Sequence, residues 1–149
     1  MAVRCVAAEF GASIPLSPGL SAPIAVASPR SGCEFPGPGS LTGKAVLVQR
    51  GMCSFETKAG NMQQAGAVAV VVINNDGTAA FQMPPGGAHG RAPVTIPAAM
   101  VSRRDGTALL DAIEREMREA SMADGASSVF ESRLRLQMVS QPVRLWLWR

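Results

Sequence analysis

The 149-residue sequence predicts an α/β fold with a mixed sheet of about six or seven strands and two main helices. Three observations support this prediction. Residues 45–76 show the pattern of a strand, a tight turn, a helix and a second strand. Residues 94–117 show another strand followed by a helix. Short strand-like runs stand before and after these two units.

The segment before residue 45 is predicted to hold two strands and one long loop. Residues 3–10 and residues 24–27 are strand-like runs, with Pro- and Gly-rich turns between them. Residues 28–43 are rich in proline and glycine, and this composition requires a loop.

The middle unit begins with residues 45–48, a short apolar run typical of a strand. Arg50 and Gly51 end this run, because glycine adopts turn conformations at no steric cost. Ser54 can accept a hydrogen bond from a backbone amide and so cap the next helix. The helix should bury one face and end at a left-handed glycine; the residues concerned are Phe55, Ala59, Met62, Ala65 and Gly66.

Residues 68–73 are a β-branched run typical of a strand buried on both faces, and residues 74–77 supply a turn. We expect this strand and the strand at residues 45–48 to be parallel neighbours joined by a right-handed crossover. Residues 77–93 follow as a long Pro- and Gly-rich loop, which is expected to be exposed and functional or mobile. Pro97 interrupts the strand at residues 94–101, which should therefore be short or at an edge.

The second helix is predicted to start at Ser102, which with Asp105 forms a capping-box-like pair. The spacing predicts that one face of this helix is buried and holds Leu109, Leu110, Ile113 and Met117. The opposite face is expected to be solvated and to carry two ion pairs, Asp111 with Arg115 and Glu114 with Arg118. Residues 133–138 then alternate at strand period and could supply a last strand.

Residues 143–149 also alternate, with Trp146 and Trp148 on one side. This segment is open to three interpretations: a final strand, an edge that binds a partner, or the remnant of a truncated reading frame. Residues 132–149 hold four arginines and no acid, so the rest of the chain is close to neutral despite a net charge of +3. A neutral body with a basic end gives little reason to expect a nucleic-acid partner.

Several landmarks, in order, resemble the protease-associated (PA) domain family. They cover roughly residues 3–113, and they comprise residues 8–11, 32–33, 43–44, 48–55, Lys58, 64–67, 71–76, 96–102, 105–106 and 109–110. The resemblance implies a small α/β module that binds or positions peptides and proteins and is not itself catalytic. We accordingly assign residues 3–122 to a PA-like domain and residues 123–149 to a C-terminal extension.

The resemblance also implies a disulfide between Cys33 and Cys53, which match positions that pair in many family members. The alternative is two small buried thiols in a reducing compartment. Cys5 is left over and is expected to be packed rather than reactive. Family members face the lumen or the exterior, yet residues 1–10 lack the features of a secretory signal. The chain is therefore expected to be a fragment of a longer secreted or membrane protein, or else a free-standing intracellular one.

No catalytic set, metal site or cofactor loop is predicted, so the chain itself is not expected to be an enzyme. The single histidine, His89, lies in the Pro- and Gly-rich loop without a nearby acid to position it. Cys53 would be consumed by the disulfide. No window approaches the roughly 18 apolar residues of a membrane span. Paired histidines, a Cys-x-x-Cys pair and a calcium-loop pattern are absent from the sequence.

A binding surface remains, and its predicted ligand is a peptide or protein segment. Its candidate residues form the turn between the strand at residues 45–48 and the following helix; they are Arg50, Gly51, Met52 and Ser54. This turn lies at the C-terminal end of the strand, which is the end at which open α/β sheets bind ligands. Arg50 is suited to a carboxylate or to peptide carbonyls, but it could instead pair with a carboxylate of the fold. Lys58 is expected to be exposed and to join an acidic partner, and His89 belongs to a movable rim at residues 81–93.

The leading functional prediction is thus a non-catalytic peptide-recognition module. One alternative is a fragment of a subtilisin-like peptidase or of a transmembrane RING-type ubiquitin ligase whose catalytic domain lies outside this chain. Another alternative is a structural spacer that binds nothing.

Overall fold

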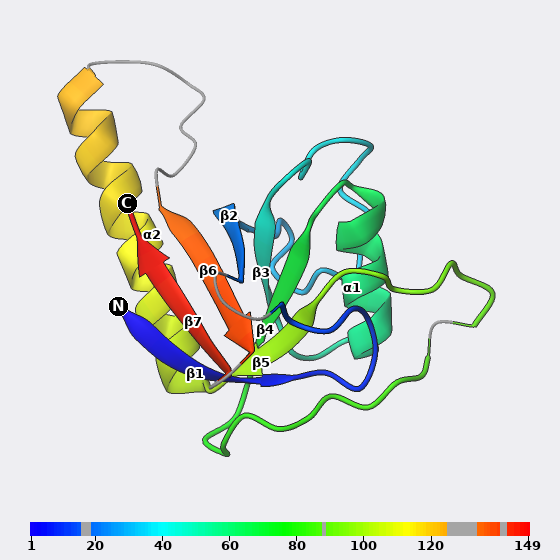
Figure 1. Cartoon of the computed structure of the whole chain (residues 1–149). Coiled ribbons are helices and arrows are strands. Elements are labelled where there is room, and N and C mark those ends of the chain that lie inside the picture. Colours follow the sequence, from blue (N-terminus) through cyan, green and yellow to red (C-terminus); the bar gives the residue numbers. More distant parts are fainter. Residues whose placement is uncertain (16–18, 88, 125–133, 141–142) are drawn as a thin grey trace.

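The computed structural model describes residues 1–15, 19–87, 89–124, 134–140 and 143–149. Within these ranges, seven strands close into a barrel in the order β1-β5-β4-β3-β2-β6-β7, accompanied by two helices (Figure 1). The α/β class is confirmed. The elements are β1 Ala2–Ala7, β2 Leu20–Val26, β3 Ala45–Gln49, α1 Phe55–Gln64, β4 Ala69–Ile73, β5 Ala98–Val101, α2 Arg103–Asp124, β6 Arg135–Ser140 and β7 Val143–Trp148.

One half of the barrel is parallel and the other half is antiparallel. Strands β2, β3, β4 and β5 pair in parallel, and the predicted parallel neighbours β3 and β4 align Val46 with Val70 and Val48 with Val72. Strand β1 pairs antiparallel with both β5 and β7, and β6 pairs antiparallel with both β2 and β7. The sheet is therefore mixed, as predicted.

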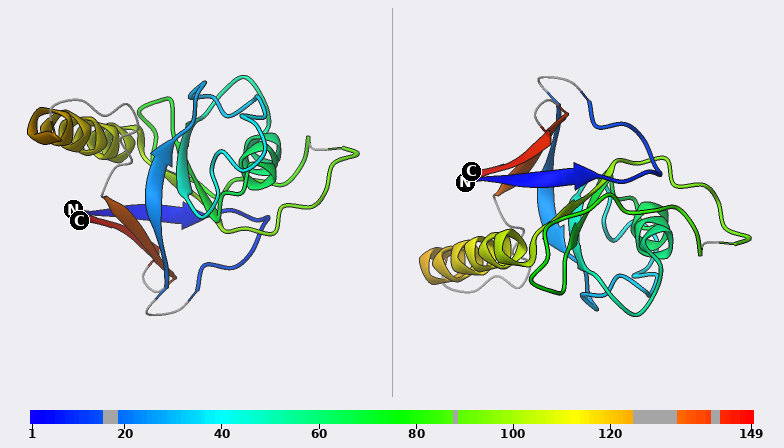
Figure 2. Two further views of the ribbon diagram at one scale, coloured as in Figure 1. Left: turned by 90° about the horizontal axis from the view of Figure 1, so that it is seen from above. Right: turned by 90° about the horizontal axis from the view of Figure 1, so that it is seen from below.

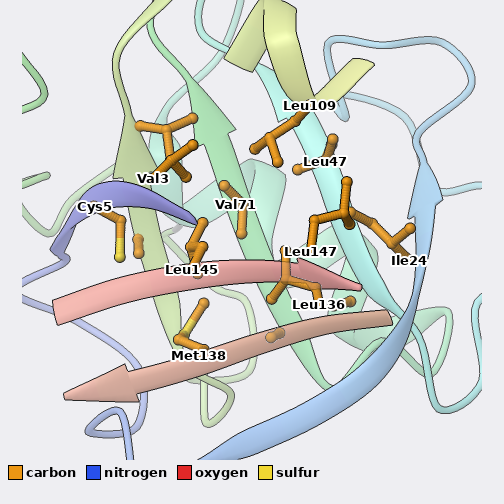
Figure 3. Close-up of a cluster of buried hydrophobic side chains, with 14 of the residues drawn as sticks. Val3, Cys5, Ile24, Leu47, Val71, Leu109, Leu136, Met138, Leu145 and Leu147 are labelled. Atoms are coloured by element: carbon orange, nitrogen blue, oxygen red, sulfur yellow. The ribbon is translucent and has the colours of Figure 1, made fainter. Parts of the chain in front are cut away.

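Strand β4 is buried over its whole length because it separates two apolar cores. Val71 points into the barrel interior, where side chains from all round the barrel meet Leu109 of α2 (Figure 3). Val70 and Val72 point the opposite way, into a second core beneath α1 that also contains Met62. Two further views place α1 and α2 on opposite sides of the strands (Figure 2).

The C-terminal segment forms a final strand, β7, which is one of the three interpretations considered for it. Leu145 and Leu147 face the barrel interior, and β7 bridges β6 and β1. Trp146 and Trp148 lie on the outer side and are 42% and 47% exposed. The pairing of β1 with β7 brings the chain ends together, and the N-terminal amine of Met1 donates to the Leu147 carbonyl at 3.3 Å.

Some details of the second half differ from expectation. Strand β5 is short, but it is not an edge, because β1 and β4 flank it. Met117 is exposed rather than buried, because the C-terminal part of α2 extends beyond the barrel (Figure 1). Glu114 pairs with Arg30 at 3.1 Å and not with Arg118, since the loop before β3 reaches α2. Ser102 caps this helix as predicted, because its Oγ accepts a hydrogen bond from the Asp105 amide at 3.1 Å.

Candidate functional site

The turn between β3 and α1 is tightly bent and covalently tied. Gly51 and Met52 have φ angles of 115° and 71°, so two successive residues occupy the left-handed region. The disulfide between Cys33 and Cys53 is present and confirms the predicted pairing. It joins the turn to the loop at residues 31–35, which precedes β3.

Arg50 is engaged by the fold itself, which is the second of the two roles considered for it. Its Nη1 donates to Asn74 Oδ1 at 2.9 Å and to Asp76 Oδ2 at 3.2 Å. Its guanidinium carbon lies 5.0 Å from the centroid of the Phe81 ring, a cation–π arrangement. Arg50 therefore fixes the turn at the end of β3 to the turn at the end of β4.

The Asp76 carboxylate is stabilised in its charged form from two sides. Thr78 donates to Asp76 Oδ1 from its hydroxyl, and also from its backbone amide at 2.9 Å. These two hydrogen bonds, followed by the charge and hydrogen bond of Arg50, hold the pKa of Asp76 below its ordinary value. The turn after β4 is thus ordered by its own side chains.

Lys58 contradicts the prediction that it is exposed and available to an acidic partner. The side chain is fully buried, and its Nζ donates to the carbonyls of Ser31, at 2.7 Å, and Gly51. The same amine lies 3.5 Å from the Cys33 sulfur. A helical side chain leans toward the N-terminus of its helix, so Lys58 reaches back under the turn. Burial lowers the pKa of its ammonium group.

The other two predicted residues take ordinary positions. Ser54 caps α1 as predicted, because its Oγ accepts from the Thr57 amide at 3.1 Å. His89 is exposed in the loop after β4. Within the described residues, no hydrogen bond or ion pair involves His89. Met52 is the remaining member of the candidate site, and its side chain is 92% exposed.

The loop at residues 77–93, leaving residue 88 aside, is attached to the rest of the fold at several points. Met83 is buried in the core beneath α1, and its carbonyl accepts from the Glu9 amide at 3.0 Å. The loop then runs along α1, and three polar contacts of helix side chains hold it. These contacts are Gly86 N to Glu56 Oε1 at 3.1 Å, Thr57 Oγ1 to the Gly87 carbonyl at 3.3 Å, and Arg91 Nη1 to Asn61 Oδ1 at 2.7 Å.

A cleft of about 560 Å³ lies across the outer side of α1, between this loop and residues 33–35. This cleft was not predicted from the sequence, because it lies along a helix and not at the ends of the strands. Two signals could have pointed to it: a glycine in the middle of the helix, Gly60, and a polar residue next to it, Asn61. The cleft is lined by Cys33, Phe35, Gly60, Asn61, Gln63, Gln64, Arg91 and Ala92.

Metal-binding clusters and membrane-spanning helices are both absent from the residues that the structure describes. Over these ranges, no group of three or more His, Cys, Asp or Glu side chains is placed to hold a metal ion. None of the helices in the described part of the chain is long and apolar enough to cross a lipid bilayer. Cys5 is packed inside the barrel as expected, and burial raises the pKa of its thiol to about 12.

Comparison with known proteins gives consistent matches. A family model described as the PA domain matches residues 20–109. The chain is 35% identical over 127 residues to human ER degradation-enhancing alpha-mannosidase-like protein 3, which covers 80% of this chain and 14% of that protein. It is 39% identical over 95 residues to probable leucine aminopeptidase 2 of Aspergillus fumigatus, covering 63% of this chain and 19% of that protein.

Among solved structures, a zinc aminopeptidase from Bacillus subtilis superposes with a TM-score of 0.59 and 28% identity. The match covers 72% of this chain and 25% of the aminopeptidase. The chain thus spans a quarter or less of the length of each of these three relatives.

Proposed function

The chain belongs to the PA domain family, and from this premise we propose that it is a non-catalytic module that recognises a peptide or protein segment. The proposed contact surface is the turn at residues 50–54, with Met52 as its central residue. Arg50 and Lys58 act there as positioning residues rather than as direct contacts. Gly51 supplies the bend, and Ser54 caps the helix behind it.

The exposure of Met52 is the observation on which this proposal rests. A non-glycine residue in the left-handed region is held at a cost of about 1–2 kcal/mol. Met52 combines that backbone, at a φ of 71°, with an apolar side chain that is 92% exposed. Glycine would make the same turn at lower cost. The flexible Met52 side chain buries little surface in its own fold and is well suited to pack against a partner.

Rigidity of the turn strengthens the proposal. The disulfide at Cys53, the hydrogen bond from Lys58 to the Gly51 carbonyl and the contacts of Arg50 hold the residues on both sides of Met52. A surface that is ordered before binding loses less conformational entropy when the partner arrives. His89 is proposed as a peripheral contact, because the neighbouring Gly87 lies beside Ser54.

The setting of the module is also a proposal. The matched relatives are much longer proteins, and two of them are named as aminopeptidases. We therefore favour a module that accompanies a hydrolase and selects or positions its substrate, over one that accompanies a ubiquitin ligase. The disulfide supports an oxidising compartment, either lumenal or extracellular. The human relative named for ER degradation is consistent with such a compartment.

The test is a selection of random peptides displayed on phage against the purified wild-type protein, after which each enriched peptide is measured against wild type and the Met52→Asp variant. Peptides selected by the turn should bind wild type at least tenfold more tightly than Met52→Asp in calorimetry, as expected for a central apolar contact. Met52→Gly is the matched control, since it retains the backbone conformation and removes only the side chain. It should also lose binding while its circular dichroism stays unchanged.

Two outcomes would contradict the proposal. Peptides that bind wild type and Met52→Asp equally would move the contact surface away from the turn. If no peptide is enriched on the wild-type protein, the structural spacer becomes the better account of the chain.

A further inference from the structure

The cleft on the outer side of α1 is a second candidate site, separate from Met52. Helix residues Gly60, Asn61, Gln63 and Gln64 line its helical side. Cys33 and Phe35 line one side wall, and Arg91 and Ala92 line the other. The volume of about 560 Å³ falls in the range of small-molecule and short-peptide pockets.

Two polar side chains of α1 hold both walls in place. Asn61 is buried and connects the two walls, because its Nδ2 donates to the Gly32 carbonyl at 3.0 Å and its Oδ1 accepts from Arg91 at 2.7 Å. Gln63 fixes the continuation of the Arg91 wall, with its Nε2 on the Pro93 carbonyl at 3.0 Å and its Oε1 on the Thr95 amide at 2.7 Å. The cleft is therefore formed before any ligand enters.

The charge of the cleft comes from one residue. Arg91 is the single charged residue among those that line it. In the described part of the chain, Arg91 makes one hydrogen bond, to the neutral amide of Asn61, and no ion pair. An exposed guanidinium that already has its orientation fixed is suited to a carboxylate, which it can bind through two parallel hydrogen bonds.

The rest of the lining fits the backbone and an apolar side chain of an extended peptide. Phe35 is 42% exposed and offers an aromatic surface. A side chain added at Gly60 would meet no atom within 4 Å, so a ligand backbone can lie close to the helix there. Gln64 is exposed and has both a donor and an acceptor for a peptide group.

We propose that this cleft binds an extended peptide by a carboxylate, held by Arg91, with a neighbouring apolar side chain against Phe35. The carboxylate can be that of a C-terminus or of an Asp or Glu side chain. A doubly charged phosphate is a poorer match, because no second cation lines the cleft. The site does not depend on the contact proposed for Met52.

The test is an NMR titration of the ¹⁵N-labelled protein with three probes: acetyl-Phe-Ala-Leu with a free C-terminus, the same peptide as its amide, and acetyl-Phe-Asp-Leu amide. The first and third probes should shift the amide signals of Gly60 and Gln64 and the Nε–H of Arg91. The second probe should bind at least tenfold more weakly. The first probe carries only a C-terminal carboxylate and the third only an Asp side-chain carboxylate, so their relative affinities show which of the two the cleft prefers.

Three variants complete the test. Arg91→Gln keeps a donor for Asn61 but removes the charge, and it should bind the acidic probes at least tenfold more weakly. Gly60→Trp should block the cleft, whereas Gly60→Ala has open space and should bind normally. Met52→Asp should leave the titration unchanged even if it abolishes recognition at the turn. Equal binding of acid and amide, unchanged binding by Arg91→Gln, or no shift at the cleft residues with any probe would overturn the proposal.

Discussion

Lys58 illustrates how much a single side chain can hold in this chain. It lies on α1, yet its ammonium group stabilises the loop at residues 31–35 and the turn at Gly51 at the same time. In the part of the chain that the structure describes, its ammonium group contacts backbone carbonyls and a disulfide sulfur and no carboxylate. A buried cation held in this way costs desolvation, which the carbonyl hydrogen bonds offset.

Lys58→Met should therefore destabilise the protein by about 1–3 kcal/mol, because two partly buried carbonyls lose their charged donor. The free energy of unfolding in urea is the measurement. Arg118→Met is the matched control, because Arg118 is an exposed cation on α2 and its loss should matter little. Equal stability of Lys58→Met and wild type would show that the carbonyls find other donors.

Asp76 should make stability depend on pH in the acid range. Its pKa is lowered in the folded protein, so its contribution is complete above the ordinary value of 3.8 and is lost as pH falls through the lower, folded value. The stability difference between wild type and Asp76→Asn should be constant above about pH 5 and shrink below pH 3.8. Urea unfolding at several pH values measures it, with Asp111→Asn, on an exposed part of α2, as the charge control. A difference that persists unchanged to pH 2 would show that the stabilisation does not depend on the charge of the Asp76 carboxylate.

Cys5 should be chemically silent in the native protein. Its thiol is buried, with its pKa raised to about 12, and the other two cysteines are joined to each other. Native protein without reductant should therefore take up no iodoacetamide at pH 8, and protein in guanidinium should take up one equivalent by intact mass. Rapid labelling of the native protein would mean that β1 opens readily.

Helix α1 connects the local and the long-range parts of the structure. Its position, cap and buried face could be predicted, because the signals lie within a few residues: Ser54 before it, the spaced apolar residues within it and Gly66 after it. Its polar contacts could not be predicted. Lys58 bonds to a residue 27 positions away and Asn61 to one 30 positions away, and sequence patterns do not report such distances.

Gln63 offers a test of how this helix orders the segment that follows the loop. Gln63→Ala removes the hydrogen bonds to Pro93 and Thr95, so the Thr95 amide should exchange its hydrogen at least tenfold faster. The neighbouring Gln64→Ala is the matched control, because Gln64 is exposed and is not one of the side chains that bond residues 93–95. Similar exchange rates in the two variants would show that the Gln63 hydrogen bonds do not hold the segment.

At the scale of the whole molecule, the closed barrel went beyond what the sequence predicted. Alternation at period two identified residues 133–138 and 143–149 as strand-like, but it does not reveal which strands pair. Closure depends on β7 pairing with β1, at the opposite end of the chain. The barrel interior consequently draws its apolar residues from both ends of the sequence, including Val3 and Leu145.

Leu145 therefore belongs to the central core rather than to a peripheral tail. Leu145→Ala should destabilise the whole protein by about 2–5 kcal/mol, as expected for a fully buried leucine. Thermal and urea unfolding measure it, and Arg144→Ala on the exposed side of the same strand is the control. If the two variants were equally stable, β7 would not be part of the cooperative unit.

The adjacency of the first and last strands has a consequence for how such a module can be carried. A host polypeptide can enter at β1 and leave at β7 through neighbouring points, so the host needs to open only a narrow gap between two of its own residues. Domain insertion is tolerated best when the inserted unit has close termini at its surface. This geometry suits a unit that occupies a small fraction of much longer proteins. Such a unit can be inserted into a loop of a host domain without separating the parts of the host on either side of that loop.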